Sequence, residues 1–135
     1  MVIYVASKFE NSKVVKEAQK ILSQDGHTIS HDWTVEDATG KSGDALERYM
    51  RVCARKDLKG VEVADALLLF NHAGGCGMFT EFGIALALRK VIVVIDAFVQ
   101  GKPKNIFFHL PEVHHVVSLR EARILFKQVD EELRK

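Results

Sequence analysis

The chain of 135 residues has little of what marks several special classes of protein. Its two cysteines, Cys53 and Cys76, are too few for a disulfide framework and do not form a C-x-x-C motif. No apolar run approaches the ~20 residues that span a bilayer, and the first residues lack the basic segment of a signal peptide. A net charge of +1 predicts no basic face for a polyanion. We therefore expect a cytoplasmic protein that binds neither a membrane nor a nucleic acid polymer.

What the sequence does contain is the ordinary composition of a globular protein. Hydrophobic residues make up 47% and charged residues 27%, which is close to the averages for soluble domains. A chain of this length buries roughly two-thirds of its unfolded surface, enough for one hydrophobic core. The sequence shows no internal repeat, low-complexity stretch or linker. We therefore expect a single domain over residues 1–135.

Strand and helix patterns alternate along the chain. Short runs rich in apolar residues predict strands at residues 2–6, 27–31, 64–70, 91–95 and, more weakly, 113–117. Apolar residues at helical spacing predict helices at residues 12–24, 45–60, 78–88 and 118–135. Polar or glycine-containing stretches predict surface loops at residues 34–43 and 101–103. The repeated strand–helix order predicts an α/β fold with a doubly wound, five-stranded parallel sheet and helices on both faces, flavodoxin-like or Rossmann-like.

Ligands of such sheets bind beyond the carboxyl ends of the strands, so the turns at this edge carry the candidate site. The most conspicuous is the glycine-rich turn at residues 71–77. It is not a dinucleotide fingerprint, because Thr80 stands where the third glycine belongs, and no Gly-Lys-Ser/Thr follows it to make a P-loop. A tight strand-to-helix turn is enough to explain its glycines.

Three side chains near this edge are candidates for chemistry. Glu81 lies one turn into an otherwise apolar helix, where a carboxylate is costly to bury without a partner. Asp57 lies among basic residues late in the preceding helix, and Tyr4 lies in the first strand. Each has an ordinary alternative: a glutamate favoured by the helix dipole, a solvated surface aspartate and a core tyrosine. The histidines lack zinc-like spacing and are interpreted as structural or surface residues, and Cys76 is at best a weak nucleophile.

Three segments together resemble the nucleoside 2-deoxyribosyltransferase family, which includes the related 2′-deoxynucleoside 5′-monophosphate N-glycosidases. Residues 3–9, IYVASKF, are similar to the family's Tyr-Leu-Ala-Gly-Pro-Phe. Residues 57–66, with DLKGV and ADA, are similar to Asp-Leu-x-x-Ile followed by Ala-Asp. Residues 77–85, GMFTEFGIA, are similar to Gly-x-x-x-Glu-Leu-Gly-x-Ala and are the most specific match. A weaker fourth match covers residues 101–105.

The resemblance implies cleavage of the C1′–N bond of a (deoxy)nucleoside through an oxocarbenium-like transition state. Glu81 matches the family's nucleophile, which forms a covalent glycosyl ester. Tyr4 would hydrogen-bond and orient Glu81, and Asp57 would be the general acid and base at the nucleobase. A second base as acceptor makes the enzyme a transferase, whereas water makes it a hydrolase. The resemblance further implies no cofactor and no metal, and a homodimer or higher homo-oligomer.

The chain also departs from the family at several positions. Ser7 and Lys8 replace the usual Gly-Pro or Gly-Ser pair. Gly75 stands where transferases carry an aspartate and the monophosphate hydrolases a phosphate-binding serine, and Glu10 replaces an arginine of the hydrolases. Asn105, in contrast, matches the transferase residue that reaches the 5′-hydroxyl in a neighbouring subunit. We therefore expect transfer of a deoxyribosyl group between bases, with hydrolysis of a nucleoside 5′-monophosphate as the alternative.

The predicted substrate contacts combine this resemblance with position at the sheet edge. Trp33, which follows the second strand, is placed to stack on the base, and Asp32 to bind its polar edge; a core anchor is the alternative for Trp33. A different class of function also remains open: a nucleotide-binding module in which Glu81 only holds a ribose hydroxyl. The full set of predicted substrate contacts is Ser7, Phe9, Asp32, Trp33, Gly75, Gly77 and Asn105.

Overall fold

A computed structural model describes residues 1–97 and 104–135. Five strands form one sheet in the order β2-β1-β3-β4-β5, and every neighbouring pair is parallel. The strands are β1 Val2–Ala6, β2 Thr28–Ile29, β3 Ala66–Phe70, β4 Val91–Ile95 and β5 Val113–Val116. The sheet confirms the predicted doubly wound α/β fold. The loop predicted at residues 101–103 lies outside the described residues.

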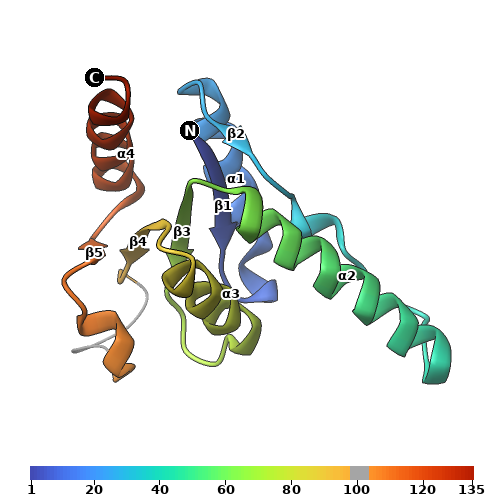
Figure 1. The fold of residues 1–135 in the computed structure, drawn as a ribbon. Coiled ribbons are helices and arrows are strands. Elements are labelled where there is room, and N and C mark those ends of the chain that lie inside the picture. Colours follow the sequence, from blue (N-terminus) through green and yellow to red (C-terminus); the bar gives the residue numbers. More distant parts are fainter. Residues whose placement is uncertain (98–103) are drawn as a thin grey trace.

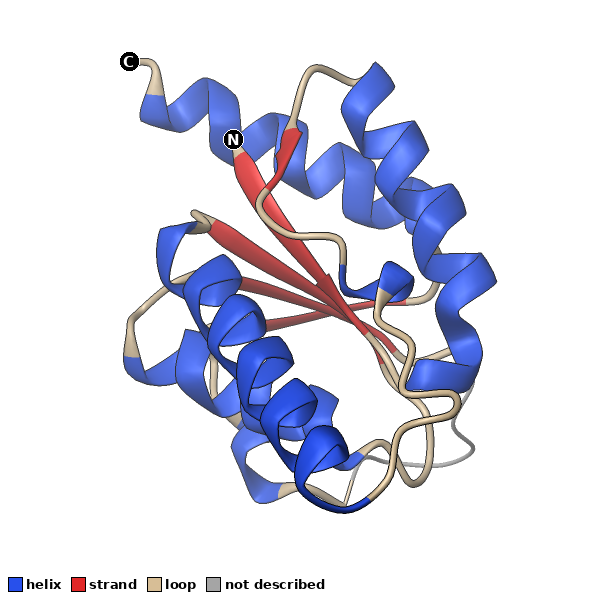
Figure 2. Ribbon diagram, turned by 90° about the vertical axis from the view of Figure 1, so that its right-hand side faces the viewer, coloured by secondary structure: helices blue, strands red, loops and turns tan. Residues whose placement is uncertain are grey.

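Helices cover both faces of this sheet (Figures 1 and 2). The helices are α1 Ser12–Gln24, α2 Gly43–Val63, α3 Cys76–Ala87 and α4 Leu119–Leu133. Short 3-10 helices are η1 Phe9–Asn11, η2 Trp33–Val35 and η3 Ile106–His109. α2 packs beside α3, while α1 and α4 are joined by an ion pair between Asp25 and Arg123. No helix in these two described stretches is both long and apolar enough to cross a membrane.

The strands are apolar throughout because they are buried on both faces. All five residues of β3 are buried, as are the last four residues of β1 and of β4. Helix ends follow local sequence: Gly26, at φ 94°, stops α1. The hydroxyl of Ser118 accepts a hydrogen bond from the Glu121 backbone N–H, and the Glu121 carboxylate accepts one from Val117 N–H. These bonds cap α4 as the Ser-x-x-Glu pattern predicts.

Two predicted boundaries are wrong in ways that matter for the site. The strand predicted at residues 27–31 is only Thr28–Ile29, because β2 is an edge strand that pairs with two residues of β1. His31 is therefore free of the sheet. The helix predicted to end near Gly60 continues to Val63, and its other end projects beyond the body of the domain (Figure 1). Gly60 is thus inside α2 and not at its end.

Candidate active site

The carboxyl ends of β1 and β3 open into a cavity of about 330 Å³, a volume within the range of small-molecule sites. The turn after β1 forms one wall and the glycine-rich turn before α3 forms another. Glu81 and Asp57 project into it from α3 and α2, and Glu36 from the loop after η2. The predicted contacts Ser7, Phe9, Trp33, Gly75 and Gly77 also line this cavity. The structure therefore brings most of the predicted site together.

Glu81 and Tyr4 form the innermost pair of the site. Tyr4 is fully buried in β1, and its hydroxyl donates a hydrogen bond to the Glu81 carboxylate. The pKa of Glu81 is raised to about 8, mainly by burial and also by the charge of Asp57, while the Tyr4 hydrogen bond opposes the shift. Burial and the Glu81 charge raise the pKa of Tyr4, so its hydroxyl stays protonated and donates. The arrangement holds one carboxylate oxygen of the partly buried Glu81 by a fixed donor.

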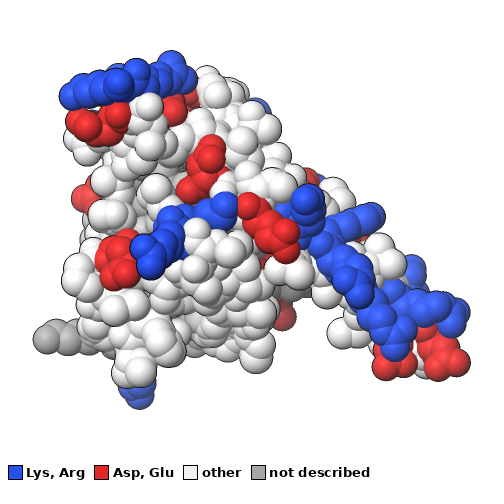
Figure 3. Space-filling model, in the orientation of Figure 1, with Lys and Arg blue, Asp and Glu red and all other residues white. Residues whose placement is uncertain are grey.

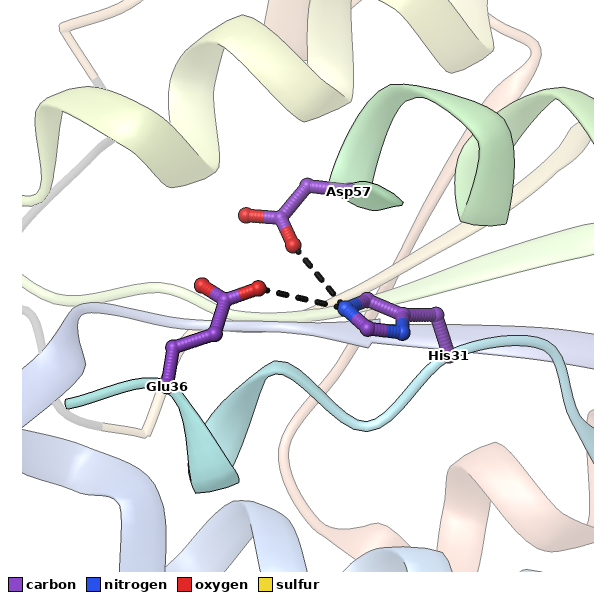
Figure 4. A group of neighbouring side chains, drawn as sticks. All are labelled: His31, Glu36 and Asp57. Atoms are coloured by element: carbon purple, nitrogen blue, oxygen red, sulfur yellow. Dashed lines mark hydrogen bonds and ion pairs between the residues drawn. The ribbon is translucent and has the colours of Figure 1, made fainter. Parts of the chain in front are cut away.

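Asp57 belongs to a cluster with His31 and Glu36, drawn in Figure 4. The Nε2 atom of His31 lies 3.2 Å from a Glu36 carboxylate oxygen and 3.2 Å from one of Asp57. The pKa of Asp57 is raised to about 7, mainly by burial and also by the hydrogen bond and charge of Glu36, while His31 opposes the shift. Asp57 is thus not a solvated surface charge, because its carboxyl group is half-buried against a second carboxyl group.

The same three residues are the one group, within the described parts of the chain, whose donor atoms all lie within 4.8 Å of one another. Such spacing suits a divalent cation as well as an ion pair. Here Nε2 of His31 already contacts both carboxylates, and these contacts account for the arrangement. We therefore interpret His31, Glu36 and Asp57 as an ion-paired cluster and not as metal ligands.

Gly60 allows α2 to approach this part of the sheet. A Cβ atom on Gly60 would lie 2.8 Å from the Cβ of His31 and 3.0 Å from two ring carbons of Tyr4. Both distances are shorter than ordinary carbon contacts. Because Asp57 lies one helical turn before Gly60, this close approach is what brings Asp57 into the cavity of Tyr4 and Glu81.

Ser7, Gly75 and Gly77 shape the two turns that close the cavity. The buried Ser7 hydroxyl donates to the Phe70 carbonyl oxygen at 3.0 Å and accepts from the Asn11 amide at 3.0 Å, so it ties the turn after β1 to the end of β3. A Cβ on Gly75 would lie 2.7 Å from the sulfur of the buried Met78, whereas one on Gly77 would meet nothing within 4 Å. Space for a substituent therefore remains at Gly77, while Gly75 is needed for the packing of Met78.

Trp33 and Asp32 lie differently from the base-binding pair that we predicted. Trp33 is 5% exposed, and its Nε1–H donates to the Val5 carbonyl oxygen at 2.6 Å. This bond makes Trp33 a core anchor whose ring edge reaches the cavity beside Phe9. The Asp32 carboxylate accepts from the Thr34 backbone N–H at 3.0 Å and from its hydroxyl at 2.5 Å. Asp32 does not line the cavity, because it caps the short helix η2.

Asn105 also stays away from this cavity within a single chain. Its side chain accepts a hydrogen bond from the Phe107 backbone N–H at 3.0 Å, at the start of η3. The next two side chains, Ile106 and Phe107, are 74% and 54% exposed. A role for Asn105 in a neighbouring copy of the chain therefore remains a prediction.

Glu36, His31 and Gly60 are the residues of the site that the sequence patterns did not indicate. Glu36 lies in a polar loop, and the spacing of His31 from other polar residues matches no zinc motif. The available signal was Gly60, a glycine three residues after Asp57 in a helical pattern. Glycine inside a helix is unfavourable by about 1 kcal/mol relative to alanine, so its presence indicates a close approach of another element.

Comparison with solved structures identifies similar folds. A 2-deoxyribosyltransferase from Bacillus psychrosaccharolyticus superposes with a TM-score of 0.71 at 20% sequence identity, over 91% of this chain and 90% of that one. This chain shares its fold. A CMP N-glycosidase from Clostridium botulinum superposes with a TM-score of 0.63 at 14% identity, over 94% and 99% of the two chains. The resemblance stated from the sequence is thus confirmed as a likeness of fold. No family model and no curated protein matches the sequence.

Proposed function

We propose that this protein cleaves the N-glycosidic bond of a deoxynucleoside and transfers the deoxyribosyl group to a second base. The observation that carries the proposal is that Glu81 and Asp57 line one cavity at the carboxyl edge of the sheet, with the buried Tyr4 hydroxyl bonded to Glu81. The names of the two similar solved structures, a 2-deoxyribosyltransferase and a CMP N-glycosidase, support chemistry at such a bond.

In the first half-reaction, a carboxylate oxygen of Glu81 attacks C1′ and the C1′–N bond breaks. The bonding electron pair leaves with the base, and Asp57 gives its proton to a base nitrogen. The product on the enzyme is a glycosyl ester of Glu81. Tyr4 holds the Glu81 side chain in place through the hydrogen bond to its carboxylate.

In the second half-reaction, an N–H of the incoming base gives its proton to Asp57, and its nitrogen bonds to C1′. The C1′–O bond to Glu81 breaks, and the carboxylate is restored. The first half-reaction therefore needs Glu81 ionised and Asp57 protonated at its start, whereas the second starts from the Glu81 ester with Asp57 ionised. The raised pKa of Asp57, about 7, supports its role as an acid near neutral pH.

Hydrolysis of a nucleoside 5′-monophosphate is the second candidate, and Lys8 favours it. Lys8 lines the cavity together with Gly75, Cys76 and Gly77 at the start of α3. A cation beside a helix N-terminus favours a phosphate group, and Gly75 lacks the acidic side chain that would repel it. We still favour transfer, because the identity at Asn105 matches the transferases.

Asn105 acts in this proposal from a neighbouring copy of the chain, because it lies outside the cavity of its own chain. The exposed apolar side chains of Ile106 and Phe107 next to it supply part of the subunit contact. We therefore expect a homodimer or larger assembly. Light scattering at the assay concentration tests this expectation, and a fully active monomer would contradict it.

The reaction is tested with a panel of deoxynucleosides and their 5′-monophosphates, each with and without a different free base. Liquid chromatography should detect the exchanged nucleoside when both substrates are present, and Glu81→Gln is the inactive control. Free base and free sugar alone, at saturating acceptor, would establish the hydrolase. Binding of a panel member without release of its base would leave the nucleotide-binding module as the function.

A further inference from the structure

We propose that Glu36 is a positioning residue that competes with Asp57 for the single Nε2 donor of His31 and so keeps a proton on Asp57 until the base leaves. The inference rests on the proposed function, in which Asp57 is the acid at the nucleobase. It assigns no bond-making step to Glu36, which acts on the substrate only through Asp57.

Glu36 is held in place by a buried side chain of η2, the element that precedes α2 in the chain. Trp33 fixes η2 to β1 through its Nε1–H bond to Val5, and the Glu36 backbone N–H donates to the Trp33 carbonyl oxygen at 3.0 Å. The Glu36 side chain then points across the cavity toward Asp57 on α2 (Figure 4). Its position is therefore set by a core residue and not by a free loop.

Glu36 and Asp57 share a single hydrogen-bond donor, which His31 supplies. Both carboxylates face the same nitrogen, Nε2, each at 3.2 Å. That nitrogen carries at most one hydrogen, which makes a good hydrogen bond to one acceptor at a time. Two ionised carboxylates that contact the same nitrogen repel each other. One additional proton shared between them removes this repulsion. The cluster therefore retains a proton that Asp57 can give to a leaving base.

The charged groups around Asp57 also favour its protonated form. Among the described residues that line this cavity, Lys8 is the cation, and His31 beside Asp57 can become positive, while Glu36 adds negative charge. The charge of Asp57 also acts on Tyr4 in β1 and on Glu81 in α3. The further titratable groups around it are Glu10 from η1, Asp37 from the loop after η2, and Tyr49 and Cys53 from α2.

The first test compares the pH dependence of kcat/KM for base release in the wild type and in Glu36→Gln. Removing the Glu36 charge lowers the pKa of Asp57, so the acid is lost earlier as pH rises. We expect the loss of activity to be smallest at acidic pH and to grow at alkaline pH, by roughly tenfold for each unit by which the pKa falls. Glu36→Asp keeps the charge and should lose less. A purely structural role would lower activity equally at every pH, and that result would overturn the proposal.

The second test does not depend on turnover. The ¹³C chemical shift of the Asp57 carboxyl group, assigned with Asp57→Asn, is followed by NMR during pH titration. The midpoint should fall in Glu36→Gln, rise in His31→Gln and stay in place in Asp37→Asn, a matched control at the exposed neighbouring carboxylate. If the wild type releases no base, the proposed function fails while this titration still decides the role of Glu36.

Two outcomes of the titration would overturn the inference. One is an unchanged Asp57 midpoint in a Glu36→Gln variant whose near-ultraviolet circular dichroism matches that of the wild type. The other is a midpoint that moves when the wild-type protein is dialysed against a chelator, because the cluster would then hold a metal ion and not a shared proton.

Discussion

The carboxylates at the two edges of the sheet have opposite electrostatic environments. At the amino edge, Asp25 accepts two hydrogen bonds from the Arg123 guanidinium, at 2.7 and 2.8 Å, and this partner lowers its pKa. Asp65 accepts the Val2 backbone N–H at 2.8 Å. At the carboxyl edge, burial raises the pKa of Glu81 to about 8 and that of Asp57 to about 7.

The outer surface follows the pattern of the amino edge. Basic and acidic side chains lie next to one another along α2 and α4 (Figure 3), with ion pairs such as Arg51–Glu47 at 3.5 Å and Arg134–Asp130 at 3.2 Å. Each edge of the sheet has its cavity, about 540 Å³ at the amino edge and about 330 Å³ at the carboxyl edge. The difference between the edges is therefore not the presence of a cavity or of carboxylates, but whether the carboxylates are paired with an arginine or a backbone N–H. Carboxyl groups with raised pKa values in a cavity are typical of sites that move protons.

Of the substitutions that test this difference between the two edges, Glu81→Gln should have the largest effect on base release. The amide keeps the shape but cannot form a glycosyl ester, so base release should be abolished, as measured by chromatography. The pKa of Glu81 in the folded state is raised above its unfolded value. The contribution of protonated Glu81 to the free energy of unfolding is therefore present at acidic pH and lost as pH rises through about 8. At alkaline pH, thermal unfolding should therefore show the variant to be more stable than the wild type. Undiminished turnover would exclude the covalent mechanism.

Asp57→Asn should have the next largest effect. Loss of a positioned proton donor slows turnover by roughly 10²–10⁴-fold, and the loss should be smallest for substrates whose base leaves easily without protonation. Rates measured over a series of substituted bases check this dependence. An equal loss for every base would show that Asp57 positions the substrate and does not protonate it.

The fold could be predicted from the sequence because its strands carry a strong local signal. β1, β3 and β4 are apolar runs whose burial on both faces leaves no alternative pattern. β2 was predicted too long because an edge strand has few partners and little compositional signal. Glu81, Asp57 and Tyr4 could be singled out through the resemblance of their segments to a known family; the structure places Glu81 and Asp57 in one cavity and bonds Tyr4 to Glu81.

The cluster at His31 could not be predicted in the same way, because it depends on contacts between three separate elements. Glu36 reaches Asp57 only because Trp33 anchors η2, and a loop glutamate has no periodicity that would reveal this. Asp32 was predicted to bind the base, yet a competing local bond to Thr34 holds it at the start of η2. Side-chain competition of this kind is decided by geometry within a few residues.

Gly60→Ala tests the close approach of α2 to the carboxyl edge, with an intermediate expected effect. The added Cβ would meet His31 and the buried Tyr4 ring at 2.8 and 3.0 Å, and such overpacking destabilises by roughly 1–3 kcal/mol. Because α2 carries Asp57, base release should fall as well. Gly83→Ala in α3 is the matched control: its Cβ would meet nothing within 4 Å, so chemical denaturation should show a gain of roughly 0.5–1 kcal/mol. Equal stability of the two variants would mean that Gly60 is not needed for the approach.

Asp25→Asn should have the smallest effect. It makes at the amino edge the same aspartate-to-asparagine change that Asp57→Asn makes at the carboxyl edge. The ion pair with Arg123 is largely exposed, so its loss should lower thermal stability only slightly at neutral pH. The folded-state pKa of Asp25 is lowered, so the contribution is present above its unfolded pKa and lost as pH falls through the folded value. Wild type and variant should therefore unfold at the same temperature in strong acid. Base release should be unchanged at all pH values where both proteins are folded; a loss comparable to that of Asp57→Asn would mean that the two edges are not functionally separate.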